Sequence, residues 1–85
     1  MLATIVYSNT ATEEDHHSHG YYPHIYESDD IEKLRYKLID LQYFLYRPDY
    51  IIVELNGYIY DATTPNTKDA KKLMEIIDGL AKLLE

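Results

Sequence analysis

The densest group of side chains able to hold a metal ion lies between Glu13 and His19. The segment reads Glu-Glu-Asp-His-His-Ser-His, so carboxylates and imidazoles follow one another closely. In an extended backbone His17 and His19 point the same way, and with His16 and the carboxylates they offer ligands for zinc, nickel or copper. Short His-rich tracts without supporting elements commonly bind metal adventitiously. We therefore predict no cofactor and keep a metal-binding protein as an alternative.

Motifs of catalysis are missing from the sequence. It has no cysteine, no nucleophile elbow, no phosphate-binding glycine loop and no His-Glu-x-x-His helix. His24 with Glu27, or Glu54 with Asp61, would be the pairs available for acid and base catalysis. We interpret both pairs as exposed polar residues of strands, with His24 in an edge packing cluster beside Tyr22 and Tyr26. The sequence predicts a protein that is not an enzyme.

Charge is distributed unevenly along the chain. The formal net charge is −7, and no lysine or arginine occurs before Lys33. Seven of the fifteen acidic residues precede that position, and the remaining eight are matched by eight bases. A surface rich in carboxylates attracts a basic partner and disfavours direct contact with nucleic acid, whose phosphates need cations. We expect a protein partner with a basic surface, although a merely solvated acidic segment is the simpler alternative.

Tyrosine is the most unusual part of the composition. The chain has ten tyrosines, one phenylalanine and no tryptophan. Tyrosine combines an apolar ring with a hydrogen-bonding tip, which suits contact surfaces. Together with the acids, the aromatic residues define the predicted partner-binding set: Glu13, Glu14, Asp15, Tyr21, Tyr22, Tyr26, Glu27, Asp29, Asp30, Tyr36, Ile39, Tyr43 and Tyr46.

The segment from Pro48 to Thr63 has the most strongly determined local structure. Asn56-Gly57 separates two β-prone runs, and this pair supplies the positive φ angles of a type I′ turn. The tight turn fixes the register, so Leu55 faces Tyr58 on the core side of the hairpin. The other side carries four residues that make it a partly solvated surface, namely Ile52, Glu54, Ile59 and Asp61.

Two further strands are expected before the hairpin. Leu2 to Ser8 has the β-branched centre of a strand inside a sheet, whereas Pro23 places the run from Tyr21 to Ser28 at an edge. Residues 9–20 between them form a long acidic loop that contains the histidines.

Two helices complete the pattern. The first begins after Ser28 or Asp29 as N-cap and runs to about Tyr46 before Pro48. Its leucines form a core stripe, and Tyr36, Ile39, Tyr43 and Tyr46 form a second stripe on the opposite side, which we call the tyrosine stripe. The stripe faces a partner, a second protomer or the neighbouring helix, or its residues are merely exposed one by one. The second helix starts near Thr64-Pro65 or Thr67, with Asn66 or Thr67 as alternative caps, and is amphipathic.

These elements predict a single α+β domain over residues 1–85. Its order is ββαββα, with a four-stranded, mainly antiparallel sheet and two helices packed on one face. The strand order is not determined by the sequence. No secretion signal or membrane span is apparent, so we expect a cytoplasmic protein, in the host cytoplasm if the source is a virus.

The leading hypothesis is a small acidic binding module without catalysis, acting as an inhibitor that covers a basic nucleic-acid-binding surface of a partner. Its composition is typical of the small inhibitors that viruses and phages direct at host nucleases, such as anti-CRISPR or anti-restriction proteins. The alternatives are a homodimeric regulatory protein that associates through the tyrosine stripe, and a metal-binding protein.

Overall fold

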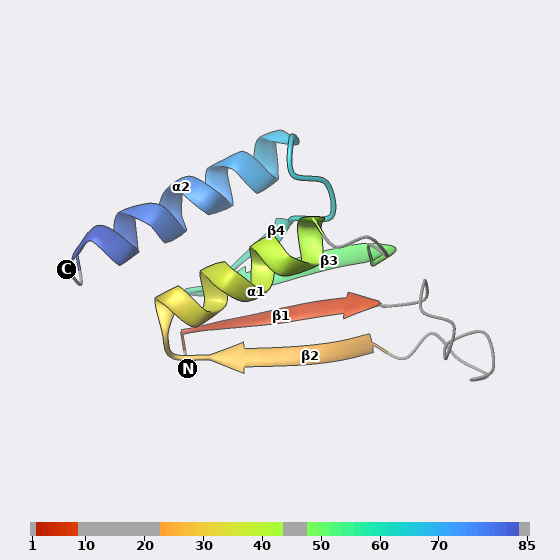
Figure 1. Cartoon of the computed structure of the whole chain (residues 1–85), viewed down its shortest axis with the longest axis horizontal. Helices are drawn as coiled ribbons and strands as arrows, with labels where there is room; N and C mark the ends of the chain where they lie inside the picture. Colours follow the sequence, from red (N-terminus) through yellow and green to blue (C-terminus); the bar gives the residue numbers. More distant parts are fainter. Residues whose placement is uncertain (1, 9–22, 44–47, 84–85) are drawn as a thin grey trace.

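A computed structural model of the protein describes residues 2–8, 23–43 and 48–83. The elements are β1 (Ala3–Ser8), β2 (Pro23–Ser28), α1 (Ile31–Tyr43), β3 (Tyr50–Leu55), β4 (Tyr58–Asp61) and α2 (Lys68–Leu83). The strands form one antiparallel sheet in the order β2-β1-β3-β4 (Figure 1). The predicted α+β fold with ββαββα order is confirmed, and the strand order is new information.

The hairpin has the predicted register. Leu55 pairs with Tyr58 and Val53 with Tyr60, and the turn residues Asn56 and Gly57 have φ angles of 52° and 84°. Positive φ at both positions is the requirement of a type I′ turn, whose twist matches that of the strands. The local sequence therefore determines how β3 and β4 align.

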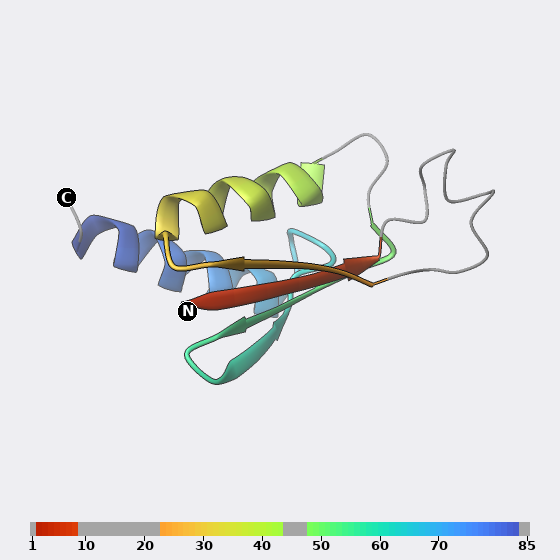
Figure 2. The same ribbon diagram turned by 90° about the horizontal axis from the view of Figure 1, so that it is seen from below.

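The strand β1 lies between β2 and β3 and pairs antiparallel with both. This confirms its predicted place inside the sheet, and it confirms β2 as an edge strand. Pro23 begins β2, where its missing N–H removes little from the ladder. As a consequence, β2 and β3 run parallel to each other on the two sides of β1 (Figure 2).

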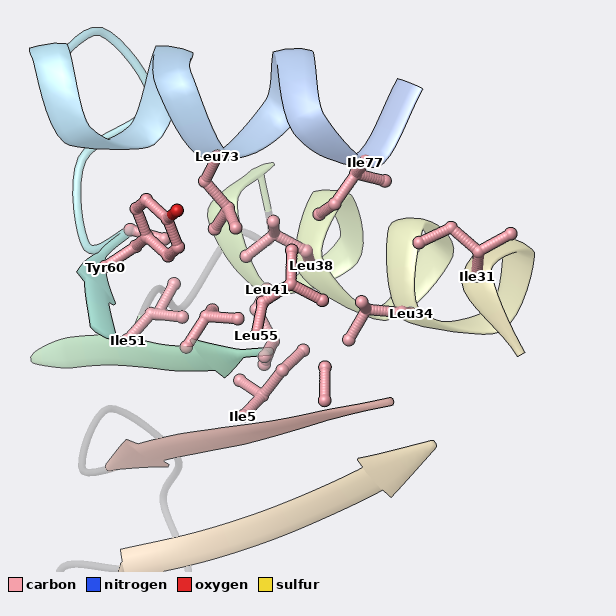
Figure 3. Close-up of a cluster of buried hydrophobic side chains, with 13 residues drawn as sticks. Ile5, Ile31, Leu34, Leu38, Leu41, Ile51, Leu55, Tyr60, Leu73 and Ile77 are labelled. Atoms are coloured by element: carbon pink, nitrogen blue, oxygen red, sulfur yellow. The ribbon is translucent and has the colours of Figure 1, made fainter. Parts of the chain in front are cut away.

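The hydrophobic core lies between one face of the sheet and the two helices (Figure 3). Alternate residues of β1 and β3 supply Ile5, Ile51, Val53 and Leu55, all of them buried. The inner stripes of the helices cover these side chains with Ile31, Leu34, Leu38 and Leu41 from α1 and Leu73 and Ile77 from α2. One face of the sheet is thereby covered, and neither helix of the described part of the chain lies on the opposite face.

The start of α1 differs in detail from expectation, and the start of α2 is one of the predicted alternatives. Asp30, rather than Ser28 or Asp29, is the N-cap of α1, because its Oδ1 accepts from the amides of Glu32 at 2.9 Å and Lys33 at 3.2 Å. Ser28 supports this cap, since its Oγ accepts from the Asp30 amide at 3.0 Å. Thr67 caps α2 through the Ala70 amide at 3.2 Å. The α1 cap thus lies one residue after Asp29 and two after Ser28, whereas the α2 cap is one of the predicted positions.

The glycines at the hairpin and in α2 give a matched pair of predictions. A Cβ at Gly57 or at Gly79 would meet no atom within 4 Å, so packing plays no part at either site. Gly57→Ala is expected to destabilise the protein by about 1 kcal/mol, because alanine is strained at positive φ. Gly79→Ala, inside a helix, is expected to stabilise it by up to about 1 kcal/mol. Urea unfolding of the two variants measures both signs, and equal signs would contradict this account.

The length and composition of the helices bear on membrane association. Within the described ranges, neither α1 nor α2 combines the length and apolar character that a membrane-spanning helix requires.

Candidate protein-interaction surface

The face of the sheet that the helices leave uncovered is built from alternate residues of all four strands. Its cross-strand pairs place Val6 beside Ile25 and Ile52, and Thr4 beside Glu27 and Glu54. On the outer strand, Ile59 lies beside Glu54 and Asp61 lies beside Ile52. We call this surface the open sheet face, and it consists of Thr4, Val6, Ile25, Glu27, Ile52, Glu54, Ile59 and Asp61.

Large apolar side chains are exposed on the open sheet face. Ile25 is 64% exposed and Ile59 is 71% exposed, while Val6 and Ile52 are half-buried between their neighbours. Ile25, Val6 and Ile52 form one continuous row across three strands. A contiguous apolar row flanked by polar residues is typical of a protein-interaction site.

The charge of the open sheet face is entirely negative in the described part of the chain. Glu27, Glu54 and Asp61 are exposed there, whereas every described lysine and arginine belongs to α1 or α2 on the other side of the sheet. Glu27 and Glu54 lie on the two strands that flank β1, which puts them two strand spacings apart, or about 10 Å. The molecule therefore presents an apolar and acidic face to its surroundings.

Asp61 differs from the two glutamates because it is engaged in a local network. Its Oδ1 accepts from the Thr63 hydroxyl at 2.6 Å and from the Thr63 amide at 3.0 Å. These bonds hold the pKa of Asp61 below its usual range. The Thr63 hydroxyl oxygen in turn accepts from the Ile51 amide at 2.9 Å. Asp61 therefore organises the exit from β4 as well as contributing charge.

Asp61→Asn is expected to lower the free energy of unfolding at neutral pH, because an amide oxygen accepts more weakly than a carboxylate. The pKa of Asp61 is lower in the folded than in the unfolded state. The ionised side chain therefore stabilises the fold fully at pH values above the pKa of the unfolded state, and this stabilisation is lost as the pH falls through the pKa of the folded state. The stability gap between the two proteins should therefore shrink as the pH falls below the ordinary aspartate pKa of about 3.9. Urea titrations above and below this pH measure the gap, and a gap independent of pH would contradict the assignment.

The predicted tyrosine stripe lies on the helix layer. Tyr36 is 73% exposed and Tyr43 is 69% exposed, whereas Ile39 is half-buried. Ile39 and Tyr43 line a groove of about 470 Å³ between α1 and α2, where Met74 faces them. Tyr46 lies outside the described residues. The described part of the stripe is therefore largely open to solvent, although Ile39 is partly covered beside α2.

Tyr26 and His24 belong to a packing cluster at the edge of the sheet, under α1. The His24 ring stacks on Tyr7 with a centroid distance of 5.2 Å and an interplanar angle of 21°. Lys37 Nζ lies 5.2 Å from the centroid of the Tyr7 ring and 5.5 Å from that of Tyr26. Such cation–π contacts hold the lysine against the aromatic rings. His24 thus packs at the edge of the sheet as predicted, with Tyr7 as its stacking partner, and Tyr22 lies outside the described residues.

The remaining predicted residues are divided between the strand-to-helix turn and undescribed segments. Asp29 and Asp30 lie in the turn before α1, where Asp30 serves as the cap. Glu13, Glu14, Asp15, Tyr21 and Tyr22 lie outside the described residues, as do His16, His17 and His19. Among the residues that are described, no group of three or more histidine or acidic side chains is arranged to hold a metal ion.

The structure separates residues that the sequence grouped as one surface. Glu27 points to the open sheet face, while Tyr36 and Tyr43 lie on the helix layer beyond the core. Conversely, it joins Ile25 and Glu27 of β2 with Ile52 and Glu54 of β3. Alternation along the strands already assigned Ile52, Glu54, Ile59 and Asp61 to one side. The missing information was the strand order, which brings β2 next to β1.

Comparisons of the chain with protein-family models, with curated proteins and with solved structures gave no match. The function is therefore inferred from the geometry and chemistry of the surface itself.

Proposed function

We propose that the protein is a binding module without catalytic activity, whose open sheet face docks on a basic surface of a partner protein. The observation that carries the proposal is the combination on one uncovered face of two exposed isoleucines, three carboxylates and no cation within the described part of the chain. Charge of one sign speeds the encounter with an oppositely charged partner, and buried apolar area then stabilises the complex.

The chemistry of this face favours a different protein with a basic surface over nucleic acid or a second copy of this chain. Nucleic acid is disfavoured because its phosphates would lie against Glu27 and Glu54. A second copy docked through the same face is disfavoured because equivalent carboxylates would approach one another without a cation between them.

The consequence for the partner is inhibition. Basic protein surfaces commonly bind nucleic acid, because their lysine and arginine side chains contact the phosphates. A protein that places Glu27, Glu54 and Ile25 on such a surface competes with the nucleic acid for the same cations. The proposed function is therefore that of an inhibitor that acts by covering the site.

The test compares two variants with the same change in net charge. Glu27→Gln/Glu54→Gln removes two carboxylates from the open sheet face, and Asp40→Asn/Glu75→Gln removes two exposed carboxylates from the helices. Purified nucleases and nucleic-acid-binding proteins with basic clefts serve as partners, and displacement of labelled DNA is followed by fluorescence anisotropy. Only the first variant should slow association, by about tenfold at low salt. Failure of the native protein to displace DNA from any of them, or equal losses in both variants, would overturn the proposal.

A second candidate function is self-association through the tyrosine stripe, favoured by the exposure of Tyr36 and Tyr43. Sedimentation of the native protein and of Tyr36→Ala/Tyr43→Ala distinguishes the two functions. A dimer that dissociates in this variant would support the homodimer, whereas a native monomer at micromolar concentration removes it.

A further inference from the structure

We infer that the element of the partner that docks on the open sheet face is a basic amphipathic α-helix aligned with β1, whose apolar side covers Ile25, Val6 and Ile52 and whose cations reach Glu27 and Glu54. This inference rests on the proposed function and specifies the shape and residue spacing of the partner.

The open sheet face is nearly symmetric about β1. Val6 is paired with an isoleucine on each side, Ile25 and Ile52, and Thr4 is paired with a glutamate on each side. On this face each of β2 and β3 therefore carries an isoleucine followed two residues later by a glutamate. The order runs in the same direction on both strands. Thr4 and Val6 are shorter than the side chains beside them and are half-buried. Along the centre of the face, β1 therefore carries shorter side chains than the strands on either side of it.

The separation of β2 and β3 matches the width of a single helix. The flanking strands β2 and β3 lie about 10 Å apart, since each is one strand spacing of almost 5 Å from β1. An α-helix with its side chains is about 10 to 12 Å across. One helix over β1 therefore reaches the side chains of β2 and β3 at once.

The spacing of the residue rows along β1 defines the sequence of the docking helix. The row containing Thr4 is two residues from the row containing Val6, or about 6.6 Å, which is close to one helical turn. When an apolar residue at position i covers Val6, residues i+3 and i+4 lie one turn further along and on opposite flanks. Cations at these two positions would face Glu27 and Glu54. The predicted motif is an apolar residue followed by lysine or arginine at the third and fourth positions.

An extended basic segment fits the same face less well. Laid across the apolar row of Ile25, Val6 and Ile52, its backbone N–H and C=O groups would lose water without gaining partners. A helix satisfies these groups internally and exposes only side chains to the sheet. The helices of this chain do not supply such an element, because the inner stripes of α1 and α2 are buried in its own core.

Three blocked synthetic peptides of alanine, leucine and lysine test the inference with the full chain. The first carries leucine at i with lysines at i+3 and i+4, repeated once. The second has the same composition but places the lysines at i+2 and i+5, on the opposite side of the helix. The third keeps the first pattern but replaces two alanines by proline, so that it cannot form a helix. Affinities and amide chemical shifts are measured by NMR titration at low salt.

The first peptide is expected to bind at least about tenfold more tightly than the other two and to shift the amides of Thr4, Val6 and Ile52. Glu27→Gln and Glu54→Gln should each weaken it, while Asp40→Asn/Glu75→Gln should not. Equal binding of the proline peptide at the same face would overturn the helix but leave the proposed function standing. Binding of no peptide at this face, together with failure to displace DNA, would overturn both.

Discussion

Leu38→Ala is expected to destabilise the protein by about 2 to 5 kcal/mol, the usual range for truncating a fully buried leucine. Leu38 is fully buried on the inner side of α1, among side chains of the sheet and of α2 (Figure 3). Its truncation removes apolar contacts on both sides and leaves a cavity that the rigid sheet cannot close. Small domains have free energies of unfolding of about 5 to 15 kcal/mol, so this loss is a large fraction of the total.

Urea unfolding at equilibrium measures the effect, with two control variants. Leu38→Met keeps the volume and should cost less than about 1.5 kcal/mol. Leu83→Ala removes an exposed leucine at the end of α2 and should change stability by less than about 0.5 kcal/mol. A Leu38→Ala variant as stable as Leu83→Ala would contradict the assigned core.

Gln42→Glu is expected to destabilise the protein by about 2 to 3 kcal/mol at neutral pH, although it changes the side chain by only one group. Gln42 is 3% exposed, and its Nε2 donates to the carbonyl oxygen of Ala62 at 3.0 Å. This bond joins α1 to the end of the hairpin. A carboxylate at this position has no hydrogen to donate, and its charge would be buried beside a carbonyl oxygen.

The pH dependence of this variant identifies the cause. Burial beside an acceptor raises the pKa of the introduced carboxyl in the folded state, so the neutral form can donate to Ala62. At pH values below the pKa of this carboxyl in the unfolded state, near pH 4, the variant should therefore be almost as stable as the native protein. Its stability should be lost as the pH rises through the higher pKa of the folded state. Gln42→Leu, which is similar in size and does not titrate, should lose stability by the same amount at every pH. Parallel pH profiles of the two variants would contradict the proposed bond.

Both stability predictions concern the side of the sheet that faces the helices. Leu38 and Gln42 lie on α1, whereas Glu27 and Glu54 project from the opposite face of the sheet. Substitutions of Glu27 and Glu54 therefore leave the core intact. This separation allows binding variants to be compared without a loss of folding.

The sequence determined those features that depend on short-range chemistry. Alternation of apolar residues in the strands and their helical spacing near Leu34 and Leu38 predicted the order of elements and the core. Asn56-Gly57 determined the turn and the register of β3 with β4. Each of these follows from φ angles or side-chain periodicity, which nearby residues control.

Only the tertiary structure decided which strands are neighbours and which surface they form. The pairing of β1 with both β2 and β3 joins residues separated by more than twenty positions, such as Glu27 and Glu54. No local propensity encodes such a contact, because it depends on how the helices and sheet bury their apolar faces together. The sequence alone indicated an acidic and aromatic protein. The strand order placed Glu27 and Glu54 on either side of Thr4, since β1 inserts between the strands that carry them.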